Sequence, residues 1–347
     1  MLPYFVLFLL LAVLFIADYY DKRFRPFVLS VAAIALIVFS GSRIGMGRDY
    51  ALYEEAFQYP EGRTALFFEL TWQWINKGFH LLNLDFHFWL LFTAAITILL
   101  MFYGMKKMSH NIIVSIIAFV LIYRGYFETM NLIRQYVAMS IIFASFPLFL
   151  SQKHIYFFSL IGIAALFHTS ALYMLVLVPL TAKKLNTSTM VGLLIATLIF
   201  GALILNSITE YAVSALPERY GFYIEEQFTA AGSSSGIYQL FLNITAIFFA
   251  IIQPTVEKKD KKIAQFILLY VASICIYNMT ICFEVGMRLM FYPFIFIFIL
   301  IPNIYTLSDK KWQKVAISAI LIMFSLFMFK DLSNPMEPYI TYKSILF

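Results

Sequence analysis

Long apolar runs, almost free of charge, alternate with short polar gaps along the whole chain. They fall near residues 2–17, 27–41, 86–105, 111–124, 132–150, 154–181, 189–206, 237–253, 263–282, 288–306 and 315–330. A helix that crosses a bilayer needs about 20 predominantly apolar residues, within a range of about 17–25. The pattern therefore predicts an all-α polytopic membrane protein with about eleven or twelve membrane segments, organised as one transmembrane domain over residues 1–347.

The run at 154–181 is unusual because lysine stands at both of its ends. A single crossing would put Lys153 and the pair Lys183–Lys184 on opposite sides of the membrane. Two short membrane segments that meet near His168 would instead keep every lysine cluster on one side. Because cytoplasmic loops carry the positive excess, we favour this broken or re-entrant arrangement, with the lysines inside and both termini outside.

Lysine and arginine are sorted to opposite ends of the apolar runs. The chain is 62% hydrophobic and only 13% charged, whereas soluble domains carry about 25% charged residues. Lysines cluster at Lys106–Lys107, Lys183–Lys184, Lys258–Lys262 and Lys310–Lys314. Arginines occupy the intervening gaps, at Arg43, Arg48, Arg63, Arg124, Arg134, Arg219 and Arg288. With the topology above, thirteen of sixteen lysines lie inside and seven of nine arginines lie outside.

Membrane insertion accounts for the inner lysines but not for the outer arginines. The planar guanidinium group suits phosphate and carboxylate groups and stays charged near lipid. We therefore expect an anionic ligand on the outer face of the membrane. The net charge of +6 arises from the lysines of the inner face, so it does not indicate a nucleic-acid partner.

Three outer segments are long enough to contribute to a site. They are the loops at 42–85 and 207–236 and the tail after Lys330. Within the first loop, Trp72 and Trp74 lie among polar residues, which is typical of a helix in the plane of the membrane interface. The same segment, residues 64–82, could alternatively close over a substrate.

A first candidate cluster, SRIGMGRDYALYEEAF, directly follows the second span. It contains Arg43, Arg48 and Asp49, with Tyr50 and Tyr53 close behind. Its two glycines allow the backbone to approach a ligand closely, and the arginines could hold a phosphate. The alternative is a tight outer turn stabilised by an arginine–aspartate pair.

A second cluster, ETMNLIRQYVAM, lies where a later span begins. Asn131 or Thr129 could cap the helix, which would leave Arg134 and Gln135 in its first turn. A helix N-terminus with an arginine forms an anion site. The alternative is an interfacial arginine that reaches the lipid headgroups. Since arginine is costly near an apolar stretch unless it is paired, a functional role is favoured.

A third cluster, LFHTSALYM, places His168 at the break between two short segments, where Thr169 or Ser170 could cap the second. Histidine is the side chain whose unperturbed pKa is near neutrality, which suits a general acid or base. A structural histidine is the alternative. The break favours function, because non-helical backbone at membrane depth is tolerated where it is buried or lines a cavity.

Two further clusters lie late in the chain. ERYGFYIEEQF offers Arg219, Tyr220 and Tyr223 to a phosphate or a sugar, or it is a solvated loop with surface ion pairs. FEVGMRLMFY places Glu284 and Arg288 four residues apart at the outer end of a span. These two could form an ion pair that also orients Arg288.

Several common catalytic motifs are absent from the sequence. There is no HExxH, P-loop or GxGxxG arrangement that would indicate zinc hydrolysis or nucleotide binding. There is also no Asp-x-Asp pair that would suggest a divalent metal. The energy for any reaction should therefore come from an activated substrate in the membrane.

Five short features follow one another across most of the chain. They are R-I-G-M-G-R-D-Y-A-L-Y at 43–53, N-L-I-R-Q-Y at 131–136, L-F-H-T-S-A-L at 166–172, R-Y-x-x-Y at 219–223 and the arginine at 288. In this order they resemble the EpsG family of Wzy-type polymerases of bacterial surface polysaccharides. Arg48 beside Asp49 departs from that pattern, which leaves open which arginine of the first loop faces the substrate.

The resemblance implies a fold similar to that of multi-span, lipid-dependent glycosyltransferases. It also implies a polymerase of O-antigen or a related polysaccharide in the bacterial inner membrane, with its active site at the periplasmic or exterior face. Such enzymes move a growing glycan from undecaprenyl pyrophosphate to the terminal sugar hydroxyl of a lipid-linked repeat unit. The expected partners are this lipid-linked oligosaccharide, membrane lipid and a regulator of chain length; no cofactor, metal or nucleic acid is expected.

The resemblance also suggests roles for individual residues. The expected pyrophosphate ligands are Arg134, Arg288 and either Arg43 or Arg219. Further substrate contacts are expected from Arg48, Tyr50, Tyr53, Gln135, Tyr220 and Tyr223. His168 would act as the base toward the acceptor hydroxyl, with Asp49 or Glu128 as rivals.

Two other classes of protein compete with this interpretation. Flippases of lipid-linked sugars also have about twelve spans, but transporters usually place ionisable groups near the bilayer midplane. The apolar runs here are nearly uncharged away from their outer ends. A polysaccharide O-acyltransferase could also use a membrane histidine, but the inner loops are short and mostly lysine, and they show no obvious site for an acyl donor.

Overall fold

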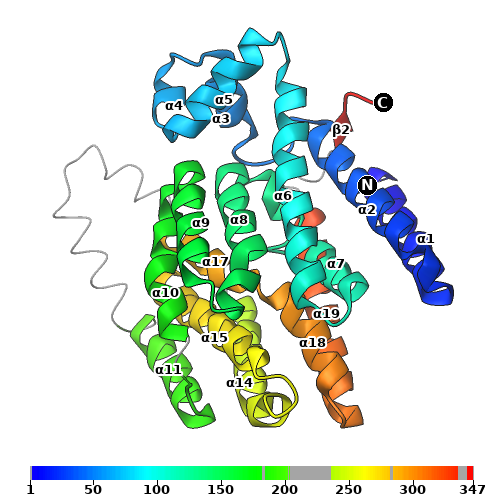
Figure 1. Ribbon diagram of the computed structural model, residues 1–347, viewed down its shortest axis with the longest axis vertical. Helices are drawn as coiled ribbons and strands as arrows, with labels where there is room; N and C mark the ends of the chain where they lie inside the picture. Colours follow the sequence, from blue (N-terminus) through cyan, green and yellow to red (C-terminus); the bar gives the residue numbers. More distant parts are fainter. Residues whose placement is uncertain are drawn as a thin grey trace. The chain divides into compact units, whose positions relative to one another are not determined.

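The computed structural model describes residues 2–181, 184–201, 203, 236–281, 284–334 and 342–346. These residues form two compact units (Figure 1). Unit 1 comprises residues 1–172 and 321–347, and unit 2 comprises residues 173–320. The single transmembrane domain over 1–347 stays a prediction.

Helices dominate both units, which confirms the predicted all-α polytopic membrane protein. Eight helical segments are long and apolar enough to cross a membrane: Leu2–Tyr20, Lys22–Gly41, Phe86–Met108, Ile133–Leu150, Gly236–Val256, Lys262–Thr280, Arg288–Leu307 and Lys311–Leu332. Four shorter apolar helices occupy Ile112–Leu121, His154–Phe167, Thr169–Thr181 and Thr187–Phe200. Within the described residues, these segments are the candidates for the predicted crossings.

The framework of unit 1 includes five apolar helices. They are α1 (Leu2–Tyr20), α2 (Arg25–Gly41), α6 (Phe86–Met108), α8 (Ile133–Leu150) and α9 (His154–Phe167). Helix α6 packs against both α2 and α8, and α8 also packs against α9. The apolar composition of these helices, without a polar stripe, suits burial against neighbours on one side and lipid on the other.

Polar side chains between the apolar runs cap the N-termini of several helices. The Asp85 carboxylate accepts hydrogen bonds from the backbone N–H groups of His87 (2.9 Å) and Phe88 (3.1 Å), which starts α6. The Asn111 side chain does the same for Ile113 (3.2 Å) in α7 (Ile112–Leu121). Such caps satisfy donors that a helix N-terminus leaves unpaired. Lys106 and Lys107 lie in the last turn of α6, where the helix dipole favours positive charge.

The long loop at 42–85 folds into a small helical cap, which consists of α3 (Tyr50–Gln58), α4 (Arg63–Leu66) and α5 (Leu70–Leu81). Figure 1 shows these three helices gathered at one end of unit 1. An aromatic cluster that includes Trp72 and Trp89, both 1% exposed, joins the cap to α6. The segment at 64–82 is therefore helical, but it is divided between α4 and α5, and one of its two tryptophans is a core residue. Its position in the membrane interface stays a prediction.

The described part of the C-terminal tail pairs with the start of the loop at 42–85. The short strand β1 (Arg43–Ile44) pairs in antiparallel fashion with β2 (Lys343–Ser344). The ring of Tyr342 stacks on that of Phe39 at 4.1 Å, and its hydroxyl donates to the Phe39 carbonyl at 2.7 Å. Residues 342–346 and the loop at 42–85 therefore lie at the same end of unit 1.

Helix α7 ends earlier than the apolar run at 111–124 suggested. It stops at Leu121, and the chain continues as a buried, largely irregular segment through residue 132 that contains η2 (Phe127–Met130). The Tyr126 N–H donates to the Phe119 carbonyl at 2.8 Å, and a Cβ at Gly125 would lie 2.0 Å from that oxygen. Only glycine fits this turn. Irregular backbone at membrane depth is tolerated when protein surrounds it.

Unit 2 is organised around α15 (Lys262–Thr280), which packs against α11 (Thr187–Phe200) and α14 (Gly236–Val256). Asn243 and Asn278 exchange a pair of 2.9 Å side-chain hydrogen bonds between α14 and α15. Such amide contacts hold membrane helices together. The remaining elements are α10 (Met174–Thr181), α16 (Glu284–Met287), η5 (Arg288–Met290), α17 (Phe291–Phe294), α18 (Ile297–Leu307) and α19 (Lys311–Leu332), whose second half belongs to unit 1.

Candidate functional site

The carboxylate of Glu69 brings two of the predicted site residues together. One oxygen, Oε2, lies 2.6 Å from Nη1 of Arg134. The other, Oε1, lies 3.0 Å from Nδ1 of His168 and 3.3 Å from the backbone N–H of Thr169. The side chains of Glu69, Arg134 and His168 are 16%, 19% and 25% exposed, so a ligand can reach them. We call these three residues the Glu69 cluster.

Each member of the cluster comes from the end of a helix in unit 1. Glu69 is the residue before α5, and its side chain does not cap that helix. Arg134 lies in the first turn of α8. His168 directly follows α9 in an extended conformation (φ −159°, ψ 112°), and η3 (Thr169–Tyr173) begins after it. The predicted break of the helix near His168 is therefore confirmed.

Contacts between the cap and the bundle hold this geometry. The indole Nε1–H of Trp72 donates to the Phe167 carbonyl at 2.7 Å, which satisfies an acceptor that the end of α9 leaves open. The Arg134 guanidinium lies 4.0 Å from the centre of the Phe68 ring. Phe68 and Trp72 lie close to Glu69 in sequence. The helical cap of α3–α5 therefore positions the Glu69 carboxylate together with Arg134 and His168.

The charges and the burial of the Glu69 cluster shift the pKa values of Glu69 and of the nearby Tyr53. Burial alone would raise the pKa of Glu69, but the His168 hydrogen bond and the Arg134 charge outweigh it and lower the pKa to about 2. An ionised carboxylate at Nδ1 assigns a proton to that nitrogen, so in the neutral tautomer of the imidazole Nε2 is the acceptor. Burial raises the pKa of Tyr53 to about 12, against the opposing effect of the Arg134 charge. Tyr53 is therefore a neutral phenol near Arg134.

One comparison with known proteins identifies the family of this chain. The model of the EpsG family matches residues 26–344, nearly the whole chain. The chain belongs to the EpsG family. This is a family of Wzy-like polymerases, so the protein has a polymerase-like role in polysaccharide biosynthesis. No curated protein and no solved structure matches the chain.

In this EpsG protein, Arg43 lies in the interior, 1% exposed. Its guanidinium donates to the carbonyls of Ser40, Met46 (3.1 Å) and Met130 (3.0 Å). These carbonyls belong to the end of α2, the glycine turn and η2, so Arg43 ties the first loop to the buried segment before α8. Its donors are directed at the protein rather than at a ligand.

Replacing Arg43 with methionine should therefore lower the free energy of unfolding by about 3 kcal/mol, since buried carbonyls would lose their donor. The expected result is a clear fall in the midpoint of thermal unfolding of the purified protein in detergent. Arg63, which is exposed on α4, provides the matched control: Arg63→Met should leave the midpoint nearly unchanged. Equal midpoints for both variants would contradict the structural role of Arg43.

The rest of the first loop forms a tight turn that docks on the buried segment. Gly45 and Gly47 have positive φ angles of 64° and 118°, and a Cβ at Gly47 would lie 3.0 Å from the Met130 carbonyl. The Arg48 N–H donates to the Asn131 side chain at 2.6 Å, while the Arg48 side chain is exposed. Asp49 is half-buried at the start of α3, and Tyr50 and Tyr53 are buried in the aromatic cluster.

The predicted caps of α8 are wrong. Its N-cap residue is Leu132, without a side-chain cap. The Asn131 side chain instead accepts the hydrogen bond from Arg48, and the Thr129 hydroxyl donates to the Tyr126 carbonyl at 2.6 Å. These side chains are used to stabilise the irregular segment, which the sequence did not indicate. The anion beside Arg134 is the protein's own carboxylate.

The remaining predicted site residues lie outside the Glu69 cluster. Gln135 is buried in α8. Glu128, the rival base, is buried and paired with Arg124 at 3.2 Å. Arg288 is half-buried in unit 2, where it begins η5, and the side chain of Glu284 lies outside the described part. Arg219, Tyr220 and Tyr223 also lie outside the described residues.

In the described part of the chain, no group of three or more His, Cys, Asp and Glu side chains could hold a metal ion. The metal-independent reaction stays a prediction.

Glu69 is the functional candidate that sequence reasoning missed. A signal was present, because Glu69 is the one charged residue in the stretch TALFFELTWQW. A carboxylate among large apolar residues is costly unless a cation or donors compensate it. That cost predicts a partner, but the partners lie 65 and 99 positions away and only the fold identifies them.

Proposed function

We propose that this EpsG-family protein is a Wzy-type glycosyltransferase. It transfers a growing glycan from undecaprenyl pyrophosphate to the terminal sugar hydroxyl of a lipid-linked repeat unit, at the outer face of the bacterial inner membrane. The observation that carries the proposal is the Glu69 cluster. A histidine held by an ionised carboxylate, beside an arginine at the ends of apolar helices, suits both the acceptor and the leaving group.

In the proposed reaction, Nε2 of His168 accepts the proton of the acceptor hydroxyl. The hydroxyl oxygen forms a bond to the anomeric carbon of the growing glycan, and the bond from that carbon to the pyrophosphate oxygen breaks. The electron pair leaves with undecaprenyl pyrophosphate. Glu69 keeps the proton of His168 on Nδ1 and stabilises the imidazolium that forms, as the buried carboxylate does in hydrolase triads.

The charge of the cluster changes in the direction that the reaction needs. With neutral His168, the charges of Glu69 and Arg134 cancel, and the cluster becomes positive when His168 takes up the proton. Negative charge develops on the pyrophosphate at the same step, so preorganised positive groups stabilise the transition state. The Arg134 side chain is 19% exposed, so part of its guanidinium can meet a phosphate oxygen.

The arginine of the first loop that serves the substrate is Arg48 in this proposal. Its side chain is exposed, whereas the donors of Arg43 are directed at backbone carbonyls. Arg288 and Arg219 stay pyrophosphate candidates on the strength of the sequence.

The proposed function is tested with purified protein and one lipid-linked repeat unit in detergent or vesicles. We expect a ladder of lipid-linked products on a gel, without added nucleotide sugar or metal. Translocation of the unit without a ladder would indicate a flippase, and an acylated unit of unchanged sugar length would indicate an acyltransferase. Either result would contradict a polymerase.

A further inference from the structure

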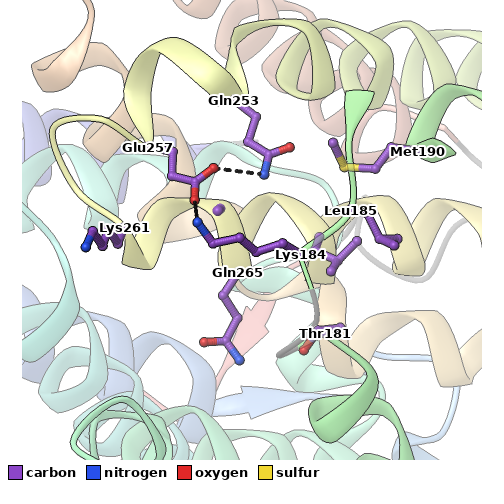
Figure 2. A pocket seen from close by; sticks show the side chains of 10 residues that line it. Thr181, Lys184, Leu185, Met190, Gln253, Glu257, Lys261 and Gln265 are labelled. Atoms are coloured by element: carbon purple, nitrogen blue, oxygen red, sulfur yellow. Dashed lines mark hydrogen bonds and ion pairs between the residues drawn. The ribbon is translucent and has the colours of Figure 1, made fainter. Parts of the chain in front are cut away.

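A pocket of about 120 Å³ lies within unit 2, where α10 and α14 end and α15 begins. None of its residues belongs to the proposed reaction. The polar side chains that line it are Thr181, Lys184, Gln253, Glu257, Lys261 and Gln265, shown in Figure 2. Apolar side chains that include Leu185 and Leu268 complete the wall.

Two amide groups of this pocket have unused hydrogen-bonding capacity. Gln253 is only 5% exposed, and its Oε1 is buried without a hydrogen-bond partner. Its Nε2 lies 3.5 Å from Glu257, at the limit of a hydrogen bond. The Nε2 of Gln265 is likewise buried without a partner. Since buried polar groups are nearly always satisfied, the pocket offers an acceptor and a donor to an occupant.

The charge of the pocket favours an anionic occupant. Glu257 is bound to Lys184, with 2.6 Å between Oε1 and Nζ, and Figure 2 shows this pair next to Gln253. Lys261 is exposed at the rim. Two ammonium groups and one carboxylate leave a single positive charge, and ammonium groups bind phosphate as point charges.

The size of the pocket limits the occupant to a small group. A cavity of about 150 Å³ holds a benzene-sized molecule, so a volume of about 120 Å³ suits a lipid headgroup or a triose-sized molecule. A nucleotide or an oligosaccharide is too large. The unused amides require that this small group carry a hydroxyl, which both donates and accepts a hydrogen bond.

We propose that this pocket is a binding site for a glycerophosphate group. The phosphate lies near the ammonium groups of Lys184 and Lys261. One glycerol hydroxyl donates to Oε1 of Gln253, and a second hydroxyl accepts from Nε2 of Gln265, because the two amides lie on opposite sides of the Lys184 side chain (Figure 2). The group is the headgroup of an anionic glycerophospholipid of the lysine-rich membrane face, or soluble glycerol phosphate, and the two sources share this chemistry.

The test uses the full-length protein in nanodiscs of phosphatidylcholine, with phosphatidylglycerol added at increasing fractions. Native mass spectrometry counts the bound phosphatidylglycerol, and isothermal titration measures glycerol 3-phosphate in discs that lack phosphatidylglycerol. The variants are Gln253→Leu, which removes the buried acceptor, and Lys261→Gln, which removes an exposed charge and should not disturb folding. Lys310→Gln removes an exposed lysine that does not line the pocket and serves as the matched control.

We expect Gln253→Leu and Lys261→Gln each to weaken binding about tenfold, in line with the loss of one hydrogen bond or ion contact, while Lys310→Gln binds like the wild type. Variant-sensitive binding of phosphatidylglycerol alone identifies a lipid, and variant-sensitive binding of glycerol 3-phosphate identifies a soluble ligand. The proposal is overturned if neither ligand binds, or if both pocket variants bind as the wild type does. In that case water fills the pocket.

Discussion

Replacing Glu69 with glutamine should reduce chain elongation by about 10²–10⁴-fold, the usual contribution of a positioned general base. The pKa of Glu69 is lowered to about 2, so the wild type carries this negative charge throughout the neutral pH range. Glutamine has the same shape, but its amide can present an N–H to Nδ1 of His168. The imidazole would then favour the wrong tautomer, and the imidazolium would lose its counter-charge.

The measurement is the length distribution of the product from one lipid-linked repeat unit, with the amount of membrane-inserted protein determined in parallel. Glu61→Gln is the matched control, because Glu61 lies in the same loop with its side chain 75% exposed and pairs with Lys77 at the surface. It makes the same change of charge and should retain wild-type elongation. Equal ladders from Glu69→Gln and the wild type would remove Glu69 from the reaction.

Much of the fold follows from hydropathy and charge because the membrane imposes both. Apolar helices of sufficient length and the one-sided lysines predict the spans, and the same lysines predict the break at His168, which the structure shows as the end of α9. The end of α7 could not be predicted in this way. Hydropathy does not reveal that the buried segment at 122–132 finds backbone partners inside the protein, such as the Phe119 carbonyl.

Site residues could be predicted from the sequence only where an ionisable side chain stands next to an apolar stretch, because its burial costs free energy unless it has a partner. Arg134 and His168 attract attention because each lies against an apolar stretch, and the structure joins both to Glu69. Arg43 and Arg48 look alike in sequence, yet one is buried against carbonyls and the other is exposed. Their difference arises from the docking of the glycine turn on η2, a long-range contact that no local pattern contains.

Replacing His168 with alanine should reduce elongation by about 10²–10⁴-fold as well, since the acceptor hydroxyl would lose its base. The informative experiment adds the double variant, His168→Ala with Glu69→Gln. Residues that act as one catalytic unit are strongly non-additive. The elongation rate of the double variant should therefore lie within about threefold of that of His168→Ala, because Glu69 has nothing to orient once the imidazole is absent.

A purely structural Glu69 predicts a different result. If its role were only to tie the cap to α8 through Arg134, its loss would add to the loss of the histidine, and the two effects would multiply in the double variant. Thermal unfolding of the same proteins separates the cases, because a structural loss lowers the unfolding midpoint of every variant that lacks Glu69. Non-additive rates at unchanged unfolding midpoints would identify Glu69 and His168 as one proton-transfer unit.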